Sequence, residues 1–152
     1  MTINQFLDTS YTAFHTVANA EAMLAEHGFT KLTLGKDFAI KRGGRYYVTR
    51  NDSGIIAFVA GQNNVFNIVE SHTDSPSFKV KGNSVTEGNG VVRVNTEKYG
   101  GGLLYTYFDR PMKIAGRLLY RTENGLQTKL AVSDYNVVIP SLCIHPVSYT
   151  HL

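Results

Sequence analysis

The chain has 152 residues, of which 43% are hydrophobic and 18% charged, as is typical of a folded globular protein. Its net charge is only +3, and its Lys and Arg residues are scattered along the chain. They do not form the basic stripe expected of a nucleic-acid-binding protein. No apolar stretch is long enough to cross a bilayer, and no signal peptide is visible. Because the single cysteine, Cys143, also suits a reducing compartment, we expect a cytoplasmic protein with no membrane or nucleic-acid partner.

The first thirty residues have the hydrophobic spacing of an amphipathic helix pair. Apolar residues recur there at steps of three and four. Ser10 and Thr12 are both candidate caps for a second helix over 13–26, and Gly28 is well placed to end it. We therefore expect two helices whose apolar sides pack on another element.

From residue 45 the hydrophobic period changes from that of a helix to that of strands. The segments 45–50 and 54–60 are rich in β-branched and aromatic residues, and 51–54 predicts a turn between them. A third apolar run, 65–69, leads directly into His72. Its largely apolar character predicts a strand buried on both faces of a sheet.

Beyond residue 82 the chain contains short β-like pieces and no long helical pattern. This order of elements favours an α/β domain interrupted by a β-rich insertion. The further predicted strands are 77–81, 91–94, 114–121, 126–132 and 136–139.

His72 and Asp74 form the first candidate functional pair. Side chains two residues apart lie on one face of a strand, so both could point into one site. A metal-bound imidazole usually donates its other ring N–H to an acceptor, which Asp74 could supply. Zinc needs three or four protein ligands and no second histidine lies nearby, so a structural hydrogen-bonded pair remains an alternative.

The other histidines and a glycine run are weaker candidates. His15 and His27 lie in the helical region, where surface or capping roles are expected. The run Gly100–Gly102 would let the backbone approach another segment closely or adopt positive φ. It lacks the Gly-Lys-Ser/Thr ending of a phosphate-binding loop.

Five short motifs follow one another along the chain. They are His72-Thr73-Asp74-Ser75-Pro76, Lys79-Val80-Lys81, Tyr99-Gly100-Gly101-Gly102-Leu103, Phe108-Asp109-Arg110 and Ala115-Gly116-Arg117. In this order and spacing they make the chain resemble the aspartyl aminopeptidases, a family of zinc metallopeptidases. The resemblance implies an α/β catalytic domain interrupted by a β-rich domain that drives oligomer assembly. In this chain, 1–82 would begin the catalytic domain and 83–146 would begin the inserted one.

The resemblance also implies site roles and a reaction. His72 would be a metal ligand in a site for two zinc ions, and Asp74 the carboxylate that orients it. His145 would bind substrate in the active site of a neighbouring subunit, although an ordinary histidine of a β-domain is the alternative. The reaction would release an N-terminal residue, often Asp or Glu, from a peptide, with the remaining ligands and the general base farther along a longer chain.

The last six residues, 147–152, resemble the in-frame translation of a transposon end rather than the family's continuation. We therefore expect them to be a non-native tail, and this chain to be a truncated and inactive fragment of a homo-oligomeric enzyme. The competing hypothesis is a non-enzymatic β-rich binding or assembly module.

Overall fold

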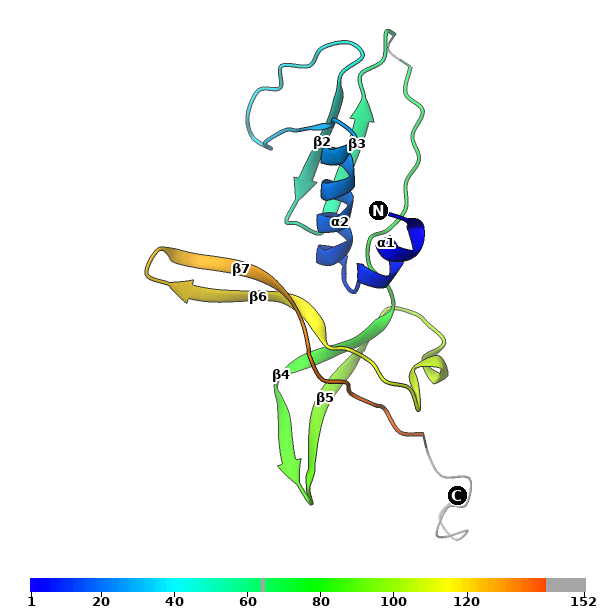
Figure 1. The fold of residues 1–152 in the computed structure, drawn as a ribbon, viewed down its shortest axis with the longest axis vertical. Coiled ribbons are helices and arrows are strands. Elements are labelled where there is room, and N and C mark those ends of the chain that lie inside the picture. Colours follow the sequence, from blue (N-terminus) through cyan, green and yellow to red (C-terminus); the bar gives the residue numbers. More distant parts are fainter. Residues whose placement is uncertain (64, 142–152) are drawn as a thin grey trace. The chain divides into compact units, whose positions relative to one another are not determined.

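A computed structural model describes residues 1–63 and 65–141 (Figure 1). These residues pack into two compact units, the first formed by Met1–Ser75 and Ala115–Ala131. The second comprises Pro76–Ile114 and residues 132–141. Each unit has its own strands and its own packing contacts.

The two predicted helices of the first unit are confirmed. Helix α1 spans Ile3–Thr9 and α2 spans Ala13–Glu26. The Thr12 hydroxyl accepts from the backbone of the first turn of α2, so Thr12 is its N-cap. At the other end His27 is the C-cap, and Gly28 follows with a φ of +76°. Glycine at this position ends the helix without the steric cost that a Cβ would bring.

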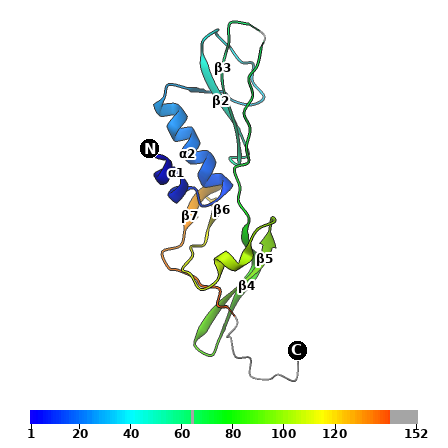
Figure 2. The same cartoon turned by 90° about the vertical axis from the view of Figure 1, so that its right-hand side faces the viewer.

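The sheet of the first unit has three strands in the order β1-β2-β3. Strand β1 (Thr30–Lys31) pairs parallel with β2 (Arg45–Arg50), and β2 pairs antiparallel with β3 (Gly54–Val59). Helix α2 lies along the β2–β3 hairpin, as two views show (Figures 1 and 2). Val17, Tyr46 and Tyr47 are the buried apolar residues of this packing.

A second hairpin completes the first unit. Strand β6 (Ala115–Thr122) pairs with β7 (Gly125–Val132), and β6 contacts α2. The chain therefore returns to the first unit after the excursion that begins at Pro76. No helix in the described ranges has the length and apolar character required to span a membrane.

The predicted buried strand at 65–69 is wrong. The described residues of this segment form no regular strand, and Phe66 and Val69 are 83% and 98% exposed. The physical reason is pairing: within 1–63 and 65–141, no strand of the β1-β2-β3 sheet hydrogen-bonds with this segment. An apolar run becomes a buried strand only when neighbouring strands satisfy its backbone groups and cover its side chains.

The second unit is built on a long antiparallel hairpin. Strand β4 (Ser77–Gly88) pairs with β5 (Val91–Tyr99), with a register irregularity between Val80 and Val85. Asn89 and Gly90 join the strands with φ values of +53° and +73°, the conformation that favours Asn-Gly in tight hairpins. The predicted strand at 136–139 is reduced to isolated bridges, Phe108 with Ile139 and Met112 with Val137.

The predicted domain boundary after Gly82 falls inside β4, and the packed units divide between Ser75 and Pro76. In addition, β6 and most of β7 pack with the first unit although they lie within 83–146. The division into a catalytic and an inserted domain stays a prediction.

The glycine run packs against Pro76 within the second unit. Gly100 has a φ of +76°, and a Cβ at Gly102 would lie 2.9 Å from the Pro76 Cβ. Tyr107, in the 3₁₀ helix η1 (Leu104–Tyr107), donates its hydroxyl to the Pro76 carbonyl and packs edge-on against Phe78. The close backbone approach predicted for this run is confirmed.

Replacing Gly102 by alanine is therefore expected to destabilise the second unit by about 1–3 kcal/mol, the usual cost of overpacking. Gly101→Ala is the matched control, because a Cβ at Gly101 meets nothing within 4 Å. Thermal unfolding of both variants checks the difference. Equal midpoints for the two variants would contradict the close approach to Pro76.

Candidate metal centre

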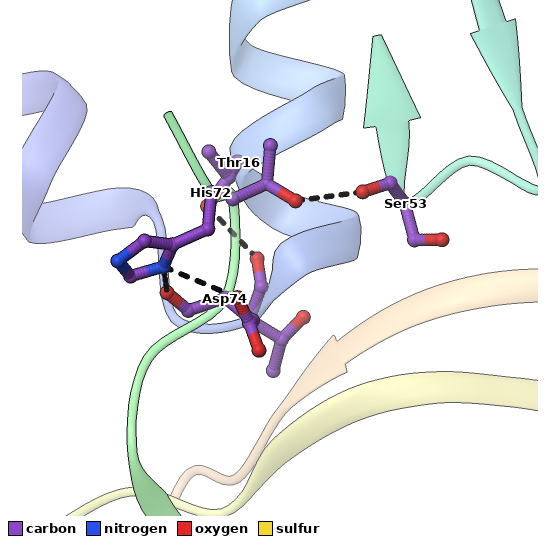
Figure 3. Close-up of polar contacts among 6 residues, drawn as sticks. Thr16, Ser53, His72 and Asp74 are labelled. Carbon is purple, nitrogen blue, oxygen red and sulfur yellow. Dashed lines mark hydrogen bonds and ion pairs between the residues drawn. The ribbon is translucent and has the colours of Figure 1, made fainter. Parts of the chain in front are cut away.

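His72 lies in an irregular segment of the first unit, not at the end of a strand. Its ring Nδ1 is 2.7 Å from the main-chain oxygen of Asp74 and 3.2 Å from the carboxylate oxygen Oδ1 (Figure 3). The two side chains are in contact, as the sequence led us to expect, but the contact arises from a local bend of the chain, and their role at a metal site stays a prediction. The shorter contact is to the backbone of Asp74 rather than to its carboxylate.

The carbonyl contact determines which ring nitrogen carries a proton. A carbonyl oxygen can only accept, so Nδ1 must donate a hydrogen to it. In the neutral imidazole, the lone pair is then on Nε2. The His72 side chain is 77% exposed, so in this tautomer the Nε2 lone pair lies on an accessible side chain, as a zinc ligand requires.

Asp74 contributes negative charge beside the imidazole. Its side chain is 43% exposed, and Oδ1 lies at ion-pair distance from Nδ1. Because the backbone oxygen of the same residue already accepts from Nδ1, the carboxylate adds charge more than it fixes the tautomer. The predicted role of Asp74 in orienting His72 therefore falls mainly to its main-chain oxygen. The orienting role stays a prediction.

One further contact attaches the His72 segment to the turn between β2 and β3, and a second contact holds that turn. The Thr73 hydroxyl donates to the Ser53 carbonyl at 2.7 Å, joining the segment to the turn between β2 and β3. The Arg117 guanidinium, on β6, donates to the carbonyl of Asn51 in the same turn at 3.0 Å. Thr73 and Arg117 both lie in sequence motifs, but the motifs indicate no role for either residue. Their partners Ser53 and Asn51 are 20 and 66 residues distant in the sequence.

The remaining candidates have structural surroundings or lie outside the described residues. His15 is buried with Nδ1 2.8 Å from the Thr12 hydroxyl, and burial lowers the pKa of its imidazole. Neither role predicted for His15 describes it, because Thr12 is the N-cap of α2 and His15 is a buried residue of the first turn. His27 bonds the Met23 carbonyl through Nδ1 at the end of α2, as expected of a capping histidine. His145, Cys143 and the tail 147–152 lie outside the described residues.

The donor set of the described chain fits one zinc ligand and not a complete site. His72 offers a suitable Nε2, while no three His, Cys, Asp or Glu side chains come together within 1–63 and 65–141. A zinc centre needs three or four protein ligands. The geometry thus offers one candidate zinc ligand, the exposed His72 ring whose Nδ1 bonds the Asp74 carbonyl.

The family model described as "Aminopeptidase I zinc metalloprotease (M18)" matches residues 6–148. The chain belongs to this family of zinc aminopeptidases. The predicted family and the predicted α/β fold class are thereby confirmed.

Three individual proteins illustrate the similarity. The chain is 41% identical to a probable M18 family aminopeptidase 2 of Clostridium novyi, over 93% of this chain and 35% of the relative. It is 38% identical to an aspartyl aminopeptidase of Aspergillus oryzae, over 92% of this chain and 30% of that relative. The structure of the mApe1 dodecamer of "S. cerevesiae" superposes with a TM-score of 0.78 at 29% identity, covering 91% of this chain and 34% of that one. The chain thus spans about a third of the length of its relatives.

Proposed function

We propose that His72 is a zinc ligand of an aminopeptidase that releases an N-terminal Asp or Glu from peptides. The carrying observation is the contact from Nδ1 to the Asp74 carbonyl, which leaves Nε2 as the metal-binding atom. Membership of a zinc metalloprotease family supports the choice of metal, and the aspartyl aminopeptidase relative supports the substrate class.

The chain's own residues would hold and orient a proton in this site. His72 keeps its hydrogen on Nδ1, the Asp74 carbonyl accepts it, and the Asp74 carboxylate places negative charge beside the ring. When bound, zinc supplies Lewis acidity that polarises a scissile carbonyl and eases deprotonation of water. We propose two zinc ions per complete site, with His72 binding one of them.

This chain alone is proposed to be inactive. One suitable imidazole within the described residues cannot supply the three or four ligands that zinc requires. The other ligands and a general base would come from a longer polypeptide, in keeping with relatives about three times as long.

We also propose homo-oligomer assembly of the longer protein, in the cytoplasm and without nucleic-acid or membrane partners. Val85, Val91 and Val92 on the β4–β5 hairpin are between 51% and 61% exposed, which favours contact with another surface. The dodecameric yeast structure supports a second copy as that surface. His145 is proposed to bind substrate in the neighbouring subunit's site.

The test compares the purified 152-residue chain with a version whose reading frame is extended along the source DNA. With zinc present, the chain should not cleave a peptide with N-terminal aspartate. The extended protein should contain further candidate metal ligands, namely an Asp, a Glu-Glu pair and a His near its C-terminal end. It should cleave the same peptide. Cleavage by the short chain would contradict its inactivity. A natural stop codon at the end of this frame would favour the binding-module alternative instead.

A further inference from the structure

The His72 segment has no regular secondary structure to hold it in place. Residues 65–76 contain neither helix nor strand, and His72 itself is exposed. A side chain on irregular, exposed backbone samples many orientations unless other groups restrict it. The pairing of His72 with Asp74 therefore depends on what anchors the residues between and around them.

Thr73 is such an anchor. It lies between His72 and Asp74 and is partly buried, with its hydroxyl donating to the Ser53 carbonyl at 2.7 Å. This bond attaches the candidate site to the β2–β3 turn, which is 20 residues earlier in the chain. The direction of the Ser53 carbonyl thus restricts the backbone on both sides of Thr73.

The turn that presents Ser53 is itself tightly constrained. Asn51 and Asp52 have φ values of +53° and +54°, a left-handed conformation that Asn and Asp tolerate better than most residues. The Ser53 N–H donates to the Arg50 carbonyl at 3.2 Å and closes the turn. These contacts define where the Ser53 carbonyl points.

Arg117 holds the outer side of the same turn. One guanidinium nitrogen donates to the Asn51 carbonyl at 3.0 Å and lies 3.5 Å from the Asp52 carboxylate. The guanidinium carbon is 4.1 Å from the centre of the Phe14 ring on α2, and the Arg117 side chain is only 18% exposed. A planar cation between an aromatic face and a turn has little freedom to move, so it stiffens both.

We propose that Thr73 and Arg117 are positioning residues for His72: Arg117 holds the 51–54 turn, and the turn holds Thr73 and with it the His72–Asp74 pair. Every residue in this series belongs to the first packed unit. The identity of the metal rests on the proposed function, whereas the positioning itself is a property of the polypeptide and can be measured without zinc.

The experiment measures the tautomer of His72 by ¹⁵N NMR of the 152-residue chain. The ratio of the Nδ1–H to the Nε2–H form reports directly on the bond to the Asp74 carbonyl. Thr73→Val removes the hydroxyl with little change of shape and should lower this ratio by roughly three- to tenfold, the effect of losing one ordinary hydrogen bond. Thr73→Ser keeps a hydroxyl and should restore most of it.

A matched control separates positioning from a general loss of stability. The Thr106 hydroxyl donates to the Leu103 carbonyl at 2.7 Å, the same kind of bond in the second unit. Thr106→Val should therefore leave the His72 ratio unchanged. An unchanged ratio in Thr73→Val, or an equal fall in Thr73→Val and Thr73→Ser, would overturn the proposal.

The zinc content of a protein of the family's full length keeps the two proposals distinguishable, because the described residues of this chain do not bring together enough ligands to hold zinc. If the tautomer ratio falls in Thr73→Val but His72→Ala leaves the zinc content of the full-length protein unaltered, positioning holds and the metal role of His72 fails. If His72→Ala removes the zinc but the tautomer ratio does not change in Thr73→Val, His72 binds metal and the positioning proposal fails.

Discussion

Replacing His72 by alanine is expected to remove most of the zinc from a protein of the family's full length. A zinc ion with three or four ligands cannot lose one without a large fall in affinity, and hydrolysis should fall with metal content. The loss should exceed the ten- to hundredfold that is typical when only a group behind a ligand is changed. Metal analysis after dialysis, together with the rate on an aspartyl peptide, measures both effects.

Asp74→Asn provides the graded comparison for that experiment. It removes the charge but keeps the main-chain carbonyl, which already accepts from Nδ1 at 2.7 Å. We therefore expect a loss of about tenfold or less in zinc affinity, at the low end for a group behind a ligand.

His27→Ala is the matched control. Its Nδ1 also bonds a backbone carbonyl at 2.7 Å, on the exposed end of α2. This change should leave the zinc content unaltered. Equal zinc contents in His72→Ala and His27→Ala would remove His72 from the metal site.

Local features of the fold could be predicted from the sequence because neighbouring residues determine them. Helix α2 begins and ends where the hydrophobic spacing, Thr12 and Gly28 indicate, and the β2–β3 hairpin follows the predicted turn. The segment 65–69 could not be predicted in the same way. Its apolar side chains indicate that the segment could be buried, but burial also requires partner strands. Within the described residues no strand pairs with this segment.

The contact between His72 and Asp74 could be predicted from the sequence, although for an incomplete reason, and their role at a metal site stays a prediction. The spacing of His72 and Asp74 indicated a shared strand face, whereas the structure joins them through the Asp74 backbone in an irregular segment. A main-chain acceptor has no signature in the residue types. The contacts of Thr73 and Arg117 join positions far apart in the chain, and a single sequence gives no measure of such pairs.

Arg117→Ala is expected to be among the most destabilising single changes in the first unit. Its stacking on Phe14 is of the kind worth about 0.5–2 kcal/mol, and its hydrogen bond to the Asn51 carbonyl is of the charged kind worth about 1.5–3 kcal/mol. The ion pair adds little, because the Asp52 side chain is 62% exposed and solvent screens it. A loss of about 2–4 kcal/mol in the free energy of unfolding is therefore expected from denaturant titration.

Two variants show whether the geometry of Arg117 matters more than its charge. Arg117→Lys keeps the charge but loses the planar group that stacks on Phe14 while reaching the turn, so it should recover less than half of the lost stability. Arg121→Ala changes an exposed arginine on the same strand and should stay within about 0.5 kcal/mol of the unmodified chain. If Arg117→Lys were as stable as the unmodified chain, charge alone would account for the contact. The planar group of Arg117 would then not be what fixes the 51–54 turn, and another contact would have to determine the position of Ser53 and therefore of Thr73 and His72.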